Sequence, residues 1–149
     1  MDTLDYLKSE HNQIRSFYLE YKKTENESVQ IKLLVSFVHN LQSLSKAVLS
    51  VLYPVFDKFD EAKPLLASLL NEHNQILSAM KAVVGALKAD RKNTRPAMEK
   101  LAGLTNSFFD HEEKDLFPLM KRLMKRPERE ALTRHMQSYL NEVKKTRAA

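Results

Sequence analysis

Apolar residues recur every three or four positions along most of this chain of 149 residues, which is the spacing of one face of an α-helix. Polar stretches at 24–28 and 90–94 interrupt the pattern and indicate short loops. The pattern predicts helices at about 3–23, 29–59, 60–89 and 95–124, and a final helix that starts near Pro127. Four long helices joined by short loops predict an all-α, up-down-up-down four-helix bundle, with the additional C-terminal helix packed across it or along it.

Prolines and small polar residues refine these boundaries. Pro54 lies inside the second predicted helix, so we expect a kink or a local break there, because proline lacks the backbone N–H that an inner helical position donates. Pro64 suits the first turn of the third helix, which we expect to begin between 60 and 64. Asp2 or Thr3 is expected to cap the first helix.

The first and third predicted helices each carry a histidine within the apolar stripe. The expected inward residues are Leu4, Leu7, His11, Ile14, Tyr18 and Tyr21 in the first helix, and Leu66, Leu70, His73, Leu77, Met80, Val84 and Leu87 in the third. One inward histidine is more often a hydrogen-bonded core residue than a metal ligand. Two of them in matching places favour a metal site, because bundle cores build such sites from facing helices.

Two short words occur twice in the chain. The sequence Glu-His-Asn-Gln-Ile stands at Glu10–Ile14 and again at Glu72–Ile76, 62 residues later. Leu52-Tyr53-Pro54 returns as Leu116-Phe117-Pro118, 64 residues later. Two short repeats at nearly the same offset predict a helical hairpin duplicated within the chain.

Composition limits the fold and the chemistry. A length of 149 residues fits one domain at 1–149, in which about 1–125 form the bundle and about 127–145 the C-terminal helix. The chain has no cysteine, so disulfides, iron–sulfur clusters and thiol catalysis are excluded, and any metal needs His, carboxylate or carbonyl ligands. No apolar run approaches the roughly 18 residues of a membrane span, and the acidic N-terminus is unlike a secretory signal. We therefore expect a cytoplasmic protein without membrane contact.

The net charge of +5 is concentrated at the C-terminal end. Residues 121–149 hold nine Lys and Arg against three Glu, so the preceding 120 residues are close to neutral. Such an excess could face nucleic acid or an acidic partner. Aromatic residues for base stacking are nearly absent there, so a solvated helix is the preferred interpretation and nucleic acid is an unexpected partner.

The fourth predicted helix holds further candidate ligands. If Phe108 points to the core, Asp115 lies near the centre of the same direction, with Glu112 to one side and His111 to the other. Ionisable groups at a core border are costly unless they are paired, hydrated or metal-bound. The alternative is that His111, Glu112 and Glu113 tilt outward as an exposed polar shoulder.

The second predicted helix offers no matching ligands. Its inward residues at this level are apolar, including Leu44, Val48 and Val51. His39 is the one histidine of this helix and stands five residues before Leu44, so we expect it at the surface or at a helix end.

These residues resemble the hemerythrin-like, or HHE cation-binding, family. The resemblance is carried by Glu10-His11, Glu72-His73, the carboxylates before Leu116-Phe117-Pro118, and Leu52-Tyr53-Pro54 at the corresponding end of the second helix. Pro127 to Leu132 followed by Met136 resembles the tail of bacterial members. The resemblance covers nearly the whole chain. It implies a four-helix bundle around a non-haem di-iron centre that binds dioxygen or reports iron and oxygen levels.

The family pattern is incomplete in this chain. His11, His73 and Glu112 match it, whereas the histidine expected four residues before Glu112 is Phe108, for which His111 could substitute from the adjacent turn. The histidine and the carboxylate expected in the second helix are replaced by Leu44 and Val48. The candidate metal ligands are therefore His11, His73, His111, Glu112 and Asp115. Such a set suits at most one Fe, Zn or Mn ion, or no ion.

Two functions remain open. The first is a metal- or redox-sensing, iron-binding regulatory protein that retains at most one metal ion. The second is a metal-free bundle that serves as a protein-interaction or regulatory module, with a protein partner or a second copy of the chain as its target. No nucleophile–base pair, phosphate-binding loop or cofactor fingerprint is present in the sequence, so we do not expect an enzyme.

Overall fold

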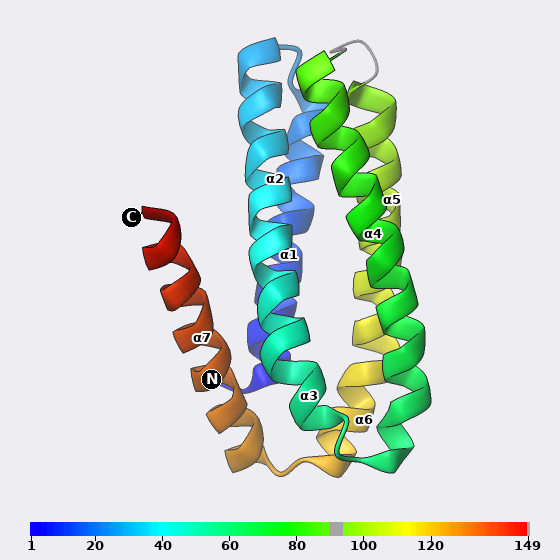
Figure 1. The fold of residues 1–149 in the computed structure, drawn as a ribbon, viewed down its shortest axis with the longest axis vertical. Coiled ribbons are helices and arrows are strands. Elements are labelled where there is room, and N and C mark those ends of the chain that lie inside the picture. The colour runs from blue at the N-terminus through cyan, green and yellow to red at the C-terminus, as the bar shows by residue number, and fades with distance from the viewer. Residues whose placement is uncertain (90–93, 149) are drawn as a thin grey trace.

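A computed structural model describes residues 1–89 and 94–148, and every described element is helical (Figure 1). The seven α-helices are α1 (Thr3–Lys23), α2 (Glu27–Ala47), α3 (Tyr53–Phe56), α4 (Lys63–Ala89), α5 (Thr94–His111), α6 (Phe117–Leu123) and α7 (Arg126–Ala148). Two π-helical turns, η1 (Val48–Leu52) and η4 (Glu112–Leu116), and a 3₁₀ turn, η2 (Asp60–Ala62), join some of them. The predicted loop at 90–94 falls largely on Asp90–Asn93, outside the described residues.

The bundle consists of two antiparallel hairpins. The first pairs α1 with α2, which continues through η1 into α3, and the second pairs α4 with α5, which continues through η4 into α6 (Figure 1). The predicted all-α, up-down-up-down bundle with a further C-terminal helix is therefore confirmed. Within the described residues no helix is both long and apolar enough to cross a membrane.

Both hairpins contain the same break before a proline. Pro54 and Pro118 sit in the first turn of α3 and α6, and each of these helices follows a five-residue π-helical turn. A proline ring inside an α-helix conflicts with the carbonyl four residues earlier and removes a donor, and a wider turn relieves the conflict. The N–H of Tyr53 accordingly bonds the Val48 carbonyl, and that of Phe117 bonds the Glu112 carbonyl, each five residues back.

The expected break at Pro54 thus takes the form of a π-helical turn. The predicted helix 95–124 contains a second one, at Glu112–Leu116, which the hydrophobic pattern did not predict. The prediction of a duplicated hairpin agrees with the backbone, because the two π-helical turns are themselves 64 residues apart.

The inward face of α4 differs from the predicted one. The buried residues follow the spacing Leu66, Leu69, His73, Ile76, Met80 and Val83, whereas Leu70, Leu77 and Val84 are 42%, 37% and 37% exposed. Apolar residues flank His73 on both sides, so helical periodicity alone could not choose between the two faces. Packing against α5 decides the choice and leaves Leu70, Leu77 and Val84 at the rim.

Helix α7 packs along the first hairpin and is fastened near its start to the N-terminus. The buried Arg129 guanidinium donates to both carboxylate oxygens of Asp2, at 2.9–3.1 Å, and to the Met124 carbonyl at 2.7 Å. Thr3 donates to the Arg129 carbonyl and lies 3.0 Å from the Thr133 hydroxyl. Asp2 also caps α1 by accepting from the Leu4 N–H. Toward its C-terminal end α7 diverges from the bundle (Figure 1).

Two neighbouring substitutions test the assigned face of α4. Ile76→Ala should lower the free energy of unfolding by about 2–4 kcal/mol, because it leaves a cavity in the core. Leu77→Ala should cost less than about 1 kcal/mol, since this side chain is already 37% exposed. Urea unfolding followed by circular dichroism measures both values. Equal losses in the two variants would contradict the assignment.

Candidate functional site

His11 lies in the centre of the bundle and is fully buried. Its Nδ1 is 2.7 Å from Glu113 Oε2, and its ring stacks on Phe109 with ring centres 3.9 Å apart. Its Nε2 faces Glu112 Oε1 at 3.2 Å but has no hydrogen bond of good geometry among residues 1–89 and 94–148. Both ring nitrogens of His11 thus face carboxylate oxygens from η4.

Glu112 is the second buried polar group, with 1% of its surface exposed. The Tyr53 hydroxyl donates to Glu112 Oε2 at 3.0 Å. Tyr53 lies at the start of α3, which continues the helix formed by α2 and η1. Burial, followed by the charge and the hydrogen bond of Glu112, raises the pKa of Tyr53, so its hydroxyl stays protonated and remains a donor. Glu112 therefore links three separate segments, namely α1, the η1–α3 junction and η4.

Glu113 holds His11 from the outer side. Its carboxylate accepts from Lys8 at 2.5 Å and from Arg15 at 2.7 Å, in addition to His11. Arg15 also donates to Asp110 at 2.9 Å. Burial alone would raise the pKa of Glu113, but the hydrogen bonds from Lys8, Arg15 and His11 outweigh it and lower this pKa to about 2. Glu113 is thus ionised at neutral pH.

His73 is buried in the second hairpin, 3% exposed, with its ring 6.2 Å from that of Phe108. Burial lowers its pKa, and the nearby charge of Glu112 opposes this shift. His73 and Glu112 line the same cavity, which measures about 10 Å³. Apolar residues, among them Leu44 and Val48, make up most of the remaining lining.

His111 and Asp115 lie apart from this centre. His111 Nδ1 is 2.5 Å from Glu72 Oε2, and its Nε2 is 3.2 Å from Asp115 Oδ2. Asp115 is about half exposed. The two carboxylates approach opposite sides of the ring, so the three side chains do not converge on one point. The alternative of an exposed polar shoulder is wrong for Glu112, which is buried, while the side chains of His111 and Glu113 are 26% and 15% exposed.

The π-helical turn explains the misplaced direction of Asp115. The prediction counted about 100° per residue from Phe108, which holds only for a regular α-helix. The wider turn at Glu112–Leu116 changes the direction of the residues within it. Glu112 consequently points into the core, while Asp115 points outward to His111.

The five predicted ligands are therefore not brought together. His11 and Glu112 are in contact, His73 shares a cavity with Glu112, and His111 and Asp115 form a separate surface pair. Within the described chain no group of three or more His, Asp or Glu side chains is arranged to hold a metal ion. Metal binding by any of these residues stays a prediction.

Sequence reasoning missed four members of the network, namely Tyr53, Glu113, Arg15 and Lys8. Tyr53 could have been found, because it is the one position that differs between Leu52-Tyr53-Pro54 and Leu116-Phe117-Pro118. The difference is the hydroxyl group, which here donates to Glu112. Glu113 and Arg15 carried no signal of their own, because exposed and half-buried charges of this kind are common on helices.

A family model for the hemerythrin HHE cation-binding domain matches residues 2–120. The chain belongs to the hemerythrin family. It is also similar to an uncharacterized hemerythrin-like protein of Schizosaccharomyces pombe, with 27% identity over 143 residues, which cover 95% of this chain and 68% of the relative. No solved structure matches the chain.

The residues of this hemerythrin-family core do not fit the di-iron centre that the resemblance implies. The second helix would supply a histidine and a bridging carboxylate at positions where Leu44 and Val48 are buried. Phe108 replaces a further histidine, and one oxygen of Glu112 already accepts from Tyr53. A cavity of about 10 Å³ holds about one water molecule at most. The site therefore lacks the donors for two ions.

Removing the Tyr53 hydroxyl tests the buried network. Tyr53→Phe should lower the free energy of unfolding by about 1–3 kcal/mol, because one oxygen of the buried Glu112 loses its donor. Tyr18→Phe is the matched control, since Tyr18 is half-buried and packs on Tyr21 and Phe37 through its ring; it should change stability by less than about 0.5 kcal/mol. Urea unfolding of both variants gives the comparison, and a neutral Tyr53→Phe would disprove the role of this bond.

The lowered pKa of Glu113 predicts an acid-sensitive bundle. A carboxyl whose pKa is depressed on folding stabilises the fold above its unfolded pKa of 4.5, and that stabilisation is lost as the pH falls from about 5 to 2. The loss amounts to about 3 kcal/mol. Glu113→Gln should flatten this part of the stability profile, whereas Glu20→Gln, at an exposed position of α1, should leave it unchanged. Urea unfolding at a series of pH values measures the slopes.

Proposed function

We propose that this hemerythrin-family chain is a regulatory or protein-interaction domain that works without a di-iron centre. The observation that supports it is the hydrogen bond from Tyr53 to Glu112, in a cavity that the apolar side chains Leu44 and Val48 also line. The carboxylate that the family uses toward metal is here engaged by a protein donor. We further propose a cytoplasmic role without catalytic activity.

In this proposal the hydrogen-bonded network takes over the structural task of a metal. A metal centre ties together the helices that ligate it. Glu112 likewise links η4 to the η1–α3 junction through the hydrogen bond from Tyr53, and to α1 through its 3.2 Å contact with His11. Glu113, Lys8 and Arg15 fix the orientation of His11 from outside. The result is a bundle whose core is held without a cofactor, which suits a scaffold for binding.

One observation favours a second candidate, a metal- or redox-sensing domain with a single Fe, Zn or Mn ion. A histidine that ligates metal usually donates its other ring N–H to a carboxylate, and His11 Nδ1 lies 2.7 Å from Glu113. His11 Nε2 then faces Glu112 Oε1 with its lone pair available. His11 and Glu112 would hold the ion, and His73, which shares a cavity with Glu112, would have to move toward them to complete the site. The ion would supply Lewis-acid or redox chemistry according to its identity.

Metal analysis separates the two candidates. The protein is loaded anaerobically with Fe(II), desalted, and analysed by mass spectrometry for iron per chain, with Zn(II) and Mn(II) in parallel. The metal-independent proposal predicts far less than about one ion per chain, and no difference between the wild type and His73→Ala. Retention of about one ion per chain that His73→Ala or His11→Ala abolishes would replace it by the single-ion candidate.

A restored variant serves as the positive control. Leu44→His, Val48→Glu and Phe108→His together return the family's missing donors to the core, and this variant should retain about two ions per chain under the same loading. Circular dichroism shows that each variant is folded. If the restored variant binds no more metal than the wild type, the three replacements are not the reason for the lost centre.

A further inference from the structure

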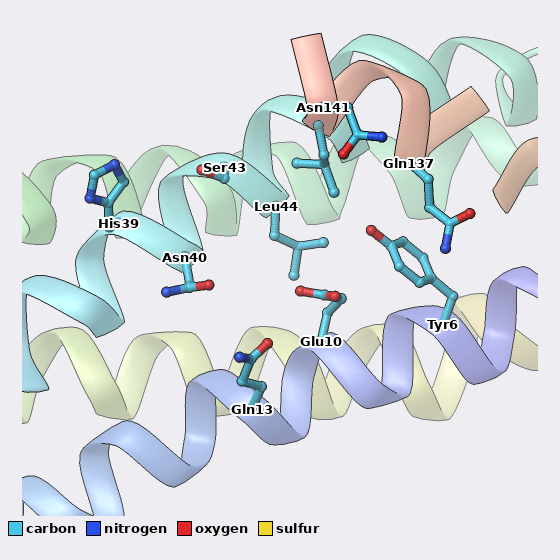
Figure 2. A pocket seen from close by; sticks show the side chains of 10 residues that line it. Tyr6, Glu10, Gln13, His39, Asn40, Ser43, Leu44, Gln137 and Asn141 are labelled. Carbon is cyan, nitrogen blue, oxygen red and sulfur yellow. The ribbon is translucent and has the colours of Figure 1, made fainter. Parts of the chain in front are cut away.

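Two cavities open on different faces of α1. Figure 2 shows the wider one, of about 690 Å³ between α1, α2 and α7, where polar side chains such as Gln13 make up most of the lining. The other cavity measures about 290 Å³, lies between α1 and α5, and is lined mainly by apolar side chains. Small-molecule sites of roughly 300–1,000 Å³ have such a lining, with a few polar groups among apolar ones. The cavity between α1 and α5 therefore has the character of a site for a small molecule.

The length of this cavity follows from the register of α1 against α5. Arg15 Nε donates to Asn106 Oδ1 at 2.9 Å and marks one end. The two helices are antiparallel, so Lys22, seven residues after Arg15, lies level with Glu99, seven residues before Asn106. Seven residues of an α-helix rise about 10 Å. The space between the two ends is long enough for two fused rings and too short for a long chain.

Aromatic rings form much of the lining. Phe37 and Phe109 are buried at the base of the cavity, and Tyr18 lines it from α1. Tyr18 and Phe37 meet edge to face, with ring centres 6.5 Å apart. Aromatic pairs gain energy beyond the area that they bury. A ring-shaped ligand would therefore bind here more tightly than an aliphatic ligand of the same size.

One buried hydroxyl group in the lining has no partner. Thr105 is 2% exposed, and its Oγ1 makes no hydrogen bond within residues 1–89 and 94–148. Buried hydroxyl groups are normally hydrogen-bonded, because their removal from water costs free energy. A threonine hydroxyl can both donate and accept. A ligand with one N–H or O–H group would supply the missing partner of Thr105.

Gly103 leaves the α5 side of the cavity open. It is an exposed residue within α5, where glycine is a poorer helix former than alanine. A Cβ atom at this position would meet nothing within 4 Å, so packing inside the protein does not require a glycine. The same free space surrounds Gly85 in α4, which does not line this cavity. A larger side chain at Gly103 would occupy the space that a ligand needs.

The charges around the cavity favour a neutral ligand. Arg15 is already paired with Asp110 at 2.9 Å and with Glu113 at 2.7 Å. Lys22 and Glu99 carry opposite charges at the same end of the cavity. An anion would be repelled by Glu99 and a cation by Lys22, so neither charge is preferred.

We propose that the cavity between α1 and α5 binds a small neutral aromatic molecule of the size of indole, with one N–H or O–H group. Its rings pack among Tyr18, Phe37 and Phe109, and its polar group forms a hydrogen bond with Thr105. Phe109 also stacks on His11, so the ligand would contact the wall of the buried network. This ligand site goes beyond the proposed function and does not depend on whether a metal is bound.

The experiment is a fluorescence titration of indole with the full chain. The chain has no tryptophan, so indole can be excited selectively beyond the absorption of tyrosine. We expect one site per chain, and Gly103→Leu should weaken binding at least about tenfold, because the new side chain fills the cavity. The matched control is Gly85→Leu, which adds the same side chain at another glycine with free space and should leave the affinity unchanged.

A second variant tests the hydrogen bond. Thr105→Val keeps the shape of the side chain and removes its hydroxyl, and it should weaken indole binding about fivefold. Benzothiophene, which has sulfur in place of the N–H, should bind the wild type and Thr105→Val equally well. Its displacement of indole measures both affinities. We expect Thr105→Val to fold, since no protein hydrogen bond of this hydroxyl is lost within the described chain.

Three results would overturn the proposal. The first is unchanged indole emission up to millimolar protein. The second is an equal loss of affinity in Gly103→Leu and Gly85→Leu, which indicates binding elsewhere. The third is unchanged indole affinity in Thr105→Val, which means that water alone satisfies this hydroxyl. Circular dichroism checks the fold of each variant. If Gly103→Leu does not fold, the comparison of indole with benzothiophene in Thr105→Val decides the question.

Discussion

The fold depends on satisfying one buried carboxylate. Glu112 lies in the centre of the bundle with almost no contact with water, and a charge in such a place is tolerated only when hydrogen bonds and partners surround it. Tyr53 and His11 reach it from two other segments, and Glu113 orients His11 in turn. These contacts of Glu112 therefore fix the positions of α1, the η1–α3 junction and η4 relative to one another along the bundle axis. The apolar core packs around a register that the polar network has defined.

The two halves of the chain show how a duplicated hairpin can diverge without losing its backbone. Both halves keep a π-helical turn before the proline of the repeated Leu-aromatic-Pro sequence, where the wider turn relieves the conflict of the proline with the preceding helix. The side chains at matching positions have different roles: Tyr53 donates a hydrogen bond to Glu112, whereas Phe117 packs near the His11 ring. In the first His-containing repeat, His11 contacts the carboxylate of Glu113. In the second repeat, Glu72 pairs with His111 near the surface.

The sequence was sufficient to predict the helices. It was also sufficient to predict an inward orientation where helical periodicity and the internal repeat agreed. His11 and His73 were predicted to point inward from helical periodicity together with the duplication, and the structure buries both. Glu112 was a candidate from its direction relative to Phe108 and from the family resemblance, and it is buried too. Asp115 was misdirected because an unrecognised π-helical turn broke the angular count. Leu70, Leu77 and Val84 were misassigned because either of two apolar stripes on α4 could have faced α5. The partners Tyr53, Glu113 and Arg15 depend on side chains from distant segments, which no local pattern encodes.

The attachment of α7 has a mechanical consequence. Asp2 and Thr3 grip this helix near its first turn, at Arg129 and Thr133, while its 23 residues extend about 34 Å to an end that diverges from the bundle. Beyond this attachment, Met136 is fully buried, and Tyr139 and Leu140 still pack against the core. The bundle therefore holds α7 over more than half of its length, and a hinge at the first turn would have to expose these side chains. Movement of α7 that keeps the core intact is confined to the part that follows Leu140.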